Sequence, residues 1–398
     1  MLATLVAMSS FALHSGDRVC FYGDSITEQQ LYTVYVEAFV HLRFPKLKVD
    51  FSNRGWSGDT AAGQTEGGPA ELRVKRDVAP VKATVVTIML GMNDGGYVPF
   101  EEKRYSAFEA SYNKLCDLLA AASAPGARFT MIETSPWDDY TRDDPTGYNG
   151  TLMKYAPVVK EAAAKRGALF VDFNAPMAKV MTEAKKKDVK LANQIVPDWI
   201  HPGVPGHIMM AGELLKAWGA PAEVCDVRLD AAAKQVSKSD NATVTGFDGL
   251  TWTELDAATP FAADPDDPAV KLVLSLYDFQ DALNRETLEV DGLAQGTYRL
   301  TIDGVAVGSF SGEELGKGIN LANYDTPMRK QAVQVVDWAW KRSHVDFARW
   351  REVDFQYADR SAGKAASKAM EKLERDVLND ELKAAQPVSH RYRLEKLS

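Results

Sequence analysis

The sequence predicts an α/β protein with a parallel β-sheet, followed by a C-terminal α+β extension of short β-hairpins and helices. Three observations predict this fold class. From about residue 16 to 220, short apolar runs alternate with longer segments of helical spacing. Several of these runs are continuous, as in strands that helices cover on both faces. After about residue 222 the alternation stops and turn-rich segments begin.

The alternating region gives its elements in a regular order. Strands are expected at 18–23, 47–53, 83–90, 127–134 and 168–173, and helices at 31–44, 69–79, 101–123, 151–167 and 206–218. Within 101–123, apolar side chains recur at spacings of three and four, at Phe108, Tyr112, Leu115, Leu119 and Ala122. Alternation of this kind is typical of a parallel sheet with right-handed crossovers.

The C-terminal region, residues 223–398, has a different pattern. Residues 240–270 are rich in Asp, Ala and Pro with little periodicity, and we expect a linker or irregular segment there. Alternating runs within 286–310, with Asp303-Gly304 between two of them, predict a β-hairpin. Roughly the last 70 residues are charge-rich and helical in pattern. We therefore expect one domain over 16–222 and an α+β module of unknown role over 223–398.

Composition excludes several classes of protein. The chain has 398 residues, 45% of them hydrophobic, which is enough for a sizeable core. The formal net charge of -9 argues against a nucleic-acid-binding protein. Cys20, Cys116 and Cys225 form no C-x-x-C pair, so the sequence predicts neither a disulfide framework nor a zinc site. No stretch approaches the ~20 apolar residues of a membrane span.

The N-terminus, residues 1–15, allows two interpretations. Residues 2–8 are apolar, and Ser10-Phe11-Ala12 resembles a cleavage site with small residues, but no basic region precedes them. The segment is therefore either a short arm packed on the body or the remnant of an export signal. The second interpretation predicts a periplasmic or secreted protein, and the first a cytoplasmic one.

Polar motifs follow the first three predicted strands. GDSIT follows the first strand, NRGWSGDT the second and LGMNDGG the third. Because ligands on parallel sheets bind outside the carboxyl ends of the strands, these motifs are expected to meet at one site. Ser25 in the first motif is a candidate nucleophile, since a strand end fixes its position while a turn exposes it.

A serine hydroxyl needs a base and a group that orients the base. Among the six histidines, His201 in PDWIHPGVPGH has distinctive surroundings, because Asp198 lies three residues earlier and prolines stiffen the loop. That spacing lets the carboxylate reach Nδ1 of the imidazole. His207, just inside the following helix, is expected to be structural. His41 is expected to be a surface residue or a satisfied core residue.

Acyl transfer also needs donors for the oxyanion that develops. The side-chain amide of Asn93 is one candidate. The backbone N–H of Gly58 is a second, because a glycine leaves room for close approach. The N–H of Ser25 itself is the third.

These residues carry a resemblance to a known family. Gly23-Asp24-Ser25-Ile26-Thr27, Gly58, Gly91-Met92-Asn93-Asp94 and Asp198-Trp199-Ile200-His201-Pro202 resemble the four sequence blocks of the SGNH (GDSL-type) hydrolases, in the family's order. The resemblance covers about 205 residues. It implies a flavodoxin-like three-layer α/β/α sandwich and ester hydrolysis without a metal or organic cofactor. It also implies that Ser25 is the nucleophile, His201 the base and Asp198 its orienting acid, with Gly58 and Asn93 in the oxyanion hole.

The α/β-hydrolase elbow G-x-S-x-G is not supported, because Thr27 stands two residues after Ser25. The substrate is more open. Candidate substrate contacts are Asp24, Trp56, Tyr148, Asn149 and Trp199. The polar loop 135–150 favours a sugar ester, and we expect short-chain deacetylation of a carbohydrate. The alternatives are a lysophospholipase-like or thioesterase-like lipid esterase, and a non-catalytic carbohydrate-binding or scaffold protein on the same fold.

The C-terminal module lies outside the resemblance. GINLANYDTPMRKQ, residues 318–331, is interpreted as a loop and helix N-cap, with a lid over Ser25 as the alternative. The simplest role of the module is to restrict which substrates enter. Cutting the chain after about residue 222 is then expected to spare hydrolysis of a small nitrophenyl ester, provided that the remaining domain folds.

Overall fold

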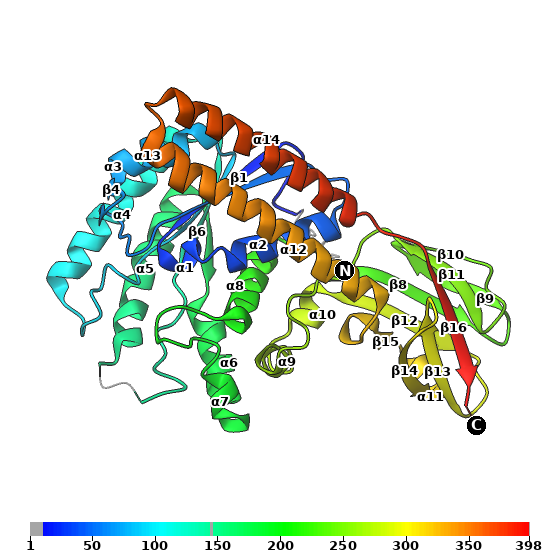
Figure 1. Ribbon diagram of the computed structural model, residues 1–398. Coiled ribbons are helices and arrows are strands. Elements are labelled where there is room, and N and C mark those ends of the chain that lie inside the picture. Colours follow the sequence, from blue (N-terminus) through cyan, green and yellow to red (C-terminus); the bar gives the residue numbers. More distant parts are fainter. Residues whose placement is uncertain (1–10, 144–145, 398) are drawn as a thin grey trace, which may run out of the picture.

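A parallel sheet forms the centre of the main body of the protein (Figure 1). The computed structural model describes residues 11–143 and 146–397. Sheet A runs in the order β2-β1-β5-β6-β7, and all neighbours pair in parallel. Its strands are β1 (Asp17–Gly23), β2 (Val49–Gly55), β5 (Val85–Met89), β6 (Arg128–Glu133) and β7 (Leu169–Asp172). When these five strands are renumbered 1 to 5 in chain order, the sheet has the 2-1-3-4-5 order of flavodoxin-like folds.

Helices cover both faces of sheet A, so the predicted three-layer α/β/α sandwich is confirmed. One layer contains α2 (Leu31–Arg43), α6 (Asn174–Lys187) and α8 (Val204–Ala217). The other contains α4 (Glu102–Ala122) and most of α5 (Tyr148–Arg166). All side chains of β5 are buried, which explains its uninterrupted apolar run.

The predicted elements of this region agree with the structure within a few residues, with two differences. The helix expected at 69–79 is broken into α3 (Ala70–Arg73), the π-helical η1 (Val74–Val78) and the 3-10 segment η2 (Ala79–Val81). Helix α6 was not predicted. The shorter elements are α1 (Ser25–Glu28), β3 (Gly63–Thr65), β4 (Gly68–Pro69) and α7 (Val189–Ala192).

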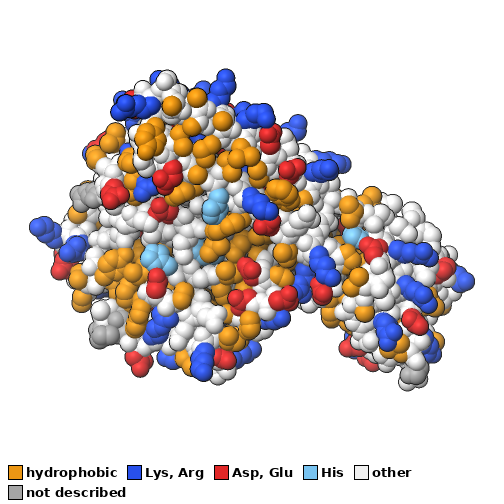
Figure 2. All heavy atoms as spheres, in the orientation of Figure 1, with side chains coloured by type: hydrophobic (Ala, Val, Ile, Leu, Met, Phe, Trp, Pro, Cys, Tyr) orange, Lys and Arg blue, Asp and Glu red, His pale blue; other side chains and the backbone are white. Residues whose placement is uncertain are grey.

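After α8 the chain builds a smaller lobe from two facing sheets (Figures 1 and 2). Sheet C has the order β15-β12-β8-β9 and sheet D the order β10-β11-β16-β13-β14. Their strands are β8 (Glu223–Asp230), β9 (Gln235–Asp240), β10 (Ala242–Thr245), β11 (Thr251–Asp256), β12 (Arg285–Asp291), β13 (Thr297–Ile302), β14 (Val305–Ser311), β15 (Ile319–Asn320) and β16 (His390–Lys396). We call this unit the β-lobe.

The hairpin predicted at Asp303-Gly304 is confirmed. Both residues have positive φ, 52° and 79°, as a two-residue turn between β13 and β14 requires. The linker expected at 240–270 is wrong for its first part, because β10 and β11 lie there. The inward-facing side chains of β11 include Glu254 and Asp256, and these buried acids obscured the alternating pattern.

The segment 318–331 belongs to the β-lobe and to the start of the next helix. β15 pairs with β12, Asn320 Oδ1 accepts from the N–H of Glu286, and Thr326 caps α12 (Pro327–Phe347). This agrees with a loop and helix N-cap. The segment contains the 3-10 turn η3 (Leu321–Asn323) and directly follows α11 (Gly312–Lys317). Two further helices, α9 (Pro268–Leu274) and α10 (Phe279–Leu283), lie between β11 and β12.

The helical tail returns to the main body. Helix α12 packs along α2 and β2, continues as the π-helical η4 (Ala348–Asp354) and α13 (Phe355–Tyr357), and is followed by α14 (Ser361–Ala384) (Figure 1). Buried ion pairs join the two parts: Arg342 holds Glu37, and Arg54 holds Asp346 at 2.7 Å. The chain then crosses back to the β-lobe, where β16 pairs between β11 and β13. The predicted helices are confirmed, but β16 was not predicted.

Most of the expected N-terminal arm, residues 1–10, lies outside the described residues. Phe11 and Ala12 contact the body: Phe11 stacks on Phe44 with ring centroids 4.5 Å apart, and the N–H of Ala12 donates to Trp218 O. Export remains a prediction. No helix among residues 11–143 and 146–397 is long and apolar enough to cross a membrane.

Candidate active site

Ser25 lies at the point where β1 ends and α1 begins. Asp24 caps this short helix, since its Oδ1 accepts from the N–H of Ile26 at 3.0 Å. Gly23 packs so closely that an added Cβ would lie 2.2 Å from Thr27 Oγ1. A glycine is therefore needed there for the tight turn that presents the serine. The first position of a helix also leaves the N–H of Ser25 without a helical acceptor.

His201 bonds to both expected partners. Its Nε2 lies 2.8 Å from Ser25 Oγ, and its Nδ1 lies 2.7 Å from Asp198 Oδ2. The loop between α7 and α8 holds this geometry, because Asp198 Oδ1 also accepts from the N–H groups of Ile200 and His201. Trp199 takes a positive φ of 78° in the same turn. The structure thus brings Ser25, His201 and Asp198 into one chain of hydrogen bonds.

The carboxylate of Asp198 is stabilised in its charged form. Partial burial would raise its pKa, but hydrogen bonds from His201 and Ile200 outweigh burial and place the pKa below its usual value. The Asp198 carboxylate therefore stays ionised while it orients the imidazole through Nδ1–H.

The expected oxyanion donors flank Ser25. β1 lies between β2 and β5 in the sheet, with Gly23 paired to Gly55 on one side and Met89 on the other. The loop after β2 contains Gly58, which is exposed and has a φ of 74°. The loop after β5 contains Asn93, whose Nδ2 donates to Asp59 O at 2.8 Å while its Oδ1 accepts from Tyr97. These bonds orient the amide and leave its second N–H available.

Two buried carboxyl groups lie behind these loops. Burial, with the like charges of Asp94 and Asp59, raises the pKa of Asp24 to about 8. Burial, with the like charge of Asp59, raises the pKa of Asp94 to about 7. The N–H of Ala61 donates to Asp94 at 2.9 Å and so ties the β2 loop to the β5 loop. Near neutral pH these values keep Asp24 mostly protonated and Asp94 only partly ionised.

The candidate substrate contacts occupy different environments. Asp24, Trp56, Tyr148 and Asn149 are buried, and Trp199 is partly exposed. Tyr148 donates to Met92 O at 2.6 Å, next to Asn93. The side chain of Asn149 bonds to Trp137, Tyr140 and Asn174, which ties the segment around Trp137 and Tyr140 to α5 and α6. Trp199 packs on Trp137 and on Arg142.

His207 and Gln29 form a link that the sequence pattern did not predict as a pair. His207 is fully buried, and burial lowers its pKa to about 3, so the ring is neutral. Its Nδ1 accepts from the N–H of Tyr32 at 3.2 Å, which leaves Nε2–H to donate to Gln29 Oε1 at 3.1 Å. Gln29 in turn donates to Pro202 O at 3.3 Å. The link joins the helix of Ser25 to the loop of His201 and gives His207 the expected structural role.

A second unpredicted feature comes from the C-terminal tail. Arg351 of η4 lies over the ring of Trp56, 3.0 Å from its centroid, and its Nε is 4.0 Å from Glu28 Oε1. Glu28 is three residues after Ser25 on α1 and accepts from Ser57 Oγ. Arg351 is 326 positions from Ser25 in the sequence, and no local pattern in its helix marks it.

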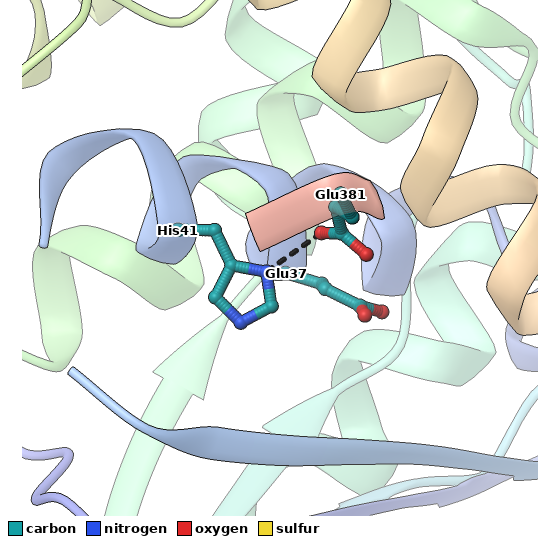
Figure 3. Close-up of side chains that lie close together, drawn as sticks. All are labelled: Glu37, His41 and Glu381. Atoms are coloured by element: carbon teal, nitrogen blue, oxygen red, sulfur yellow. Dashed lines mark hydrogen bonds and ion pairs between the residues drawn. The ribbon is translucent and has the colours of Figure 1, made fainter. Parts of the chain in front are cut away.

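Two groups among the described residues have side chains close enough to share a metal ion. Glu37, His41 and Glu381 join α2 to α14, with His41 Nδ1 2.6 Å from Glu381 Oε1 (Figure 3). The other group is Cys225, Glu254 and Asp256 in the β-lobe. Neither group includes a residue of the loops around Ser25, and the expectation of no metal and no cofactor remains a prediction. In the first group, Arg342 already pairs with Glu37 through two nitrogens.

Comparison with known proteins identifies relatives of both parts of the chain. A model of the GDSL-like lipase/acylhydrolase family matches residues 21–208, the stretch that contains Ser25, Gly58, Asn93, Asp198 and His201. An acetylxylan esterase from Geobacillus stearothermophilus is 26% identical over 223 residues, which cover 52% of this chain and 95% of that protein.

Two solved structures are similar. BT4096, described as a gut microbial diltiazem-metabolizing enzyme, has 25% identity and a TM-score of 0.81, over 98% of this chain and 99% of that one. The acetylxylan esterase Axe2 from Geobacillus stearothermophilus has 25% identity and a TM-score of 0.41, over 52% of this chain and 96% of that one. The first match extends through the C-terminal region, so the β-lobe and the helical tail occur together with this α/β domain in another protein.

Proposed function

The chain belongs to the SGNH (GDSL-type) family of ester-bond hydrolases, and from that premise we propose that it removes acetyl groups from a carbohydrate. The observation that carries the chemistry is the hydrogen-bonded chain Ser25–His201–Asp198. The substrate class is supported by the similarity to an acetylxylan esterase and by the polar loops around Ser25.

In the proposed first half-reaction, Ser25 Oγ attacks the acetyl carbonyl while His201 Nε2 takes the serine proton. Asp198 holds the imidazole in the tautomer that carries its proton on Nδ1 and none on Nε2. It also stabilises the imidazolium that forms. The carbonyl oxygen becomes an oxyanion and accepts from the N–H groups of Ser25 and Gly58 and from Asn93 Nδ2. The imidazolium then protonates the departing sugar hydroxyl, and an acetyl-Ser25 ester remains.

In the second half-reaction, His201 takes a proton from water, and the hydroxide attacks the acetyl-Ser25 carbonyl. Collapse of the second oxyanion releases acetate and returns the proton to Ser25 Oγ. The same three donors serve both steps, since the oxyanion forms at the same position.

The test uses the full chain, nitrophenyl esters of graded acyl length, acetylated xylo-oligosaccharides, lysophospholipid and diltiazem. We expect activity to be strongest on acetyl esters and to fall with chain length. Ser25→Ala is expected to abolish turnover with little change in Tm, and Ser123→Ala on the distant end of α4 serves as control. A maximum at acyl chains of about eight carbons or more, on the scale of a lipid tail, contradicts the carbohydrate assignment. Turnover that survives Ser25→Ala contradicts the mechanism.

A further inference from the structure

The helical tail places one arginine beside the proposed catalytic residues. Arg351 lies in η4, where π-helical geometry continues α12 past the end of the sheet. The guanidinium contacts the ring of Trp56 at 3.0 Å and faces Phe355 at 5.7 Å, measured to the ring centroids. Arg351 therefore belongs to the surroundings of the β2 loop, although it is encoded in the C-terminal module.

Glu28 contacts both Arg351 and Ser57, and so connects η4 to the helix of Ser25 and to the loop after β2. Its Oε1 is 4.0 Å from Arg351 Nε, and its Oε2 accepts from Ser57 Oγ. Ser57 directly precedes Gly58, and Glu28 lies one helical turn after Ser25. The Arg351–Glu28 pair thus lies next to the nucleophile's helix and to the loop of an oxyanion donor.

Unlike three other arginines of this interface, Arg351 has guanidinium N–H groups that lack a hydrogen-bond partner. Arg54, Arg73 and Arg342 each donate to carboxylates or carbonyls of neighbouring residues. Within residues 11–143 and 146–397, Arg351 makes ring contacts and the long ion pair with Glu28, but no hydrogen bond is formed by its guanidinium, and Nη1 is without an acceptor. A guanidinium has five N–H donors; because Nη1 is buried, the donors left for a ligand are those of Nε and Nη2.

The side chains around Arg351 and Glu28 fit a neutral sugar. Arg351 and Glu28 form an ion pair whose side chains are 16% and 17% exposed. The other cation against Phe355, Arg76 at 4.6 Å from the ring centroid, is paired with Asp77 at 2.6 Å. Sugar hydroxyls both donate and accept, and the pair offers donors on Arg351 and acceptors on Glu28. Phe355 is 38% exposed beside the guanidinium and offers an apolar surface to the C–H face of a ring.

We propose that Arg351, Glu28 and Phe355 form the subsite that binds the sugar of the acetylated substrate, and that it selects neutral sugars over uronic acids. This inference rests on the proposed function and names the part of the chain that recognises the alcohol. It also gives the C-terminal tail a direct role in substrate specificity. The residue that contributes to specificity then lies in η4, and not in the segment 318–331.

The experiment compares Arg351→Gln with the wild-type chain on nitrophenyl acetate and on acetylated xylo-oligosaccharides. Loss of a charge-assisted hydrogen bond is expected to lower kcat/KM for the oligosaccharide by about 10- to 100-fold, chiefly through KM. Nitrophenyl acetate has no sugar for Arg351 to bind. Its kcat/KM in Arg351→Gln is therefore expected to stay within about twofold of the wild-type value. Arg375→Gln, an exposed arginine of α14 paired with Glu371, is the matched control and is expected to change neither.

Four outcomes overturn the inference. Equal losses on both substrates, or a lower Tm alone, assign Arg351 a structural role. Unchanged kinetics on the oligosaccharide remove Arg351 from the subsite. A wild-type preference for acetylated oligogalacturonides that Arg351→Gln abolishes means that the guanidinium binds a carboxylate instead. If the wild-type chain hydrolyses nitrophenyl acetate but no acetylated sugar, the proposed substrate class fails first and the subsite falls with it.

Discussion

Asn93 shows how a single side chain is prepared for one task. The bond from Nδ2 to Asp59 O and the bond from Tyr97 to Oδ1 fix the rotation of the amide. One N–H then remains for the oxyanion of the proposed mechanism, which would find this donor already oriented. This preorganisation is the main source of stabilisation in sites of this kind.

We expect Asn93→Ala to reduce kcat for nitrophenyl acetate by a factor of roughly 100 or more, equivalent to ~3 kcal/mol of transition-state stabilisation. KM is expected to change little, because the ground-state carbonyl does not need this donor. Steady-state kinetics measures both quantities. Asn379→Ala, an exposed asparagine of α14, is the control, and near-normal kcat in Asn93→Ala would limit Asn93 to a turn role.

The residues that the sequence could predict are those with local signals. Ser25, Gly58 and Asn93 follow apolar strands directly, and Asp198 lies three positions from His201, so a single loop holds both. Gln29 and Arg351 could not be predicted. Gln29 acts through His207, 178 positions away, and Arg351 reaches Trp56 through the docking of a helix that the family pattern does not cover. Such contacts depend on tertiary packing rather than on periodicity.

At the scale of the elements, one end of the β-lobe core is acidic. Glu286 on β12 faces the space between the two sheets, together with Glu254 and Asp256 of β11 and Cys225 of β8. Burial and the neighbouring carboxylates together raise the pKa of Glu286 to about 8 and that of Asp256 to about 7. Because acidic side chains occupy inward positions of β11, this strand lacks the alternation of apolar and polar residues by which a strand is predicted.

These shifts give the β-lobe a defined pH dependence. The folded-state pKa of Glu286 lies above the value of an unfolded glutamate, so the folded state binds its proton more tightly. Its contribution to stability is complete below about pH 4 and is lost progressively as the pH rises to about 8. Relative to wild type, Glu286→Gln is expected to gain about 2–4 kcal/mol of unfolding free energy between pH 5 and pH 8, because an amide does not ionise.

Denaturant unfolding at both pH values, followed by far-UV circular dichroism, measures this gain. Glu289→Gln is the matched control, since Glu289 lies on the outer face of the same strand beside Arg228. A constant difference between Glu286→Gln and wild type across this range would mean that Glu286 is not protonated in the folded β-lobe.

At the scale of the whole molecule, the two halves of the chain share one core. The apolar cluster under α2 and α8 also contains Phe261, Val270, Val335 and Ala385 from the C-terminal region. Buried ion pairs join Glu37 to Arg342 and Arg54 to Asp346, and His41 bonds to Glu381 (Figure 3). All three C-terminal partners lie beyond residue 222. Breaking such pairs leaves unpaired polar groups in an apolar interface, which is strongly destabilising.

We therefore expect the fragment 1–222 to be insoluble or unfolded, rather than an active minimal esterase. Circular dichroism and size-exclusion chromatography of this fragment test the expectation. Co-expression of residues 223–398 as a separate chain is expected to restore solubility and nitrophenyl acetate hydrolysis. A folded, active fragment 1–222 without its complement would show that the helical tail is dispensable for the core.

The position of β16 has a consequence for how the protein is made. This strand lies in the interior of sheet D, between β11 and β13, yet its residues, His390–Lys396, follow those of every other strand of the sheet in the sequence. On the ribosome, β10–β11 and β13–β14 emerge as separate hairpins with open edges, and no earlier strand can join them. Sheet D can close only after β16 has left the ribosome, so a chain truncated before His390 exposes the edges of β11 and β13 to other nascent chains.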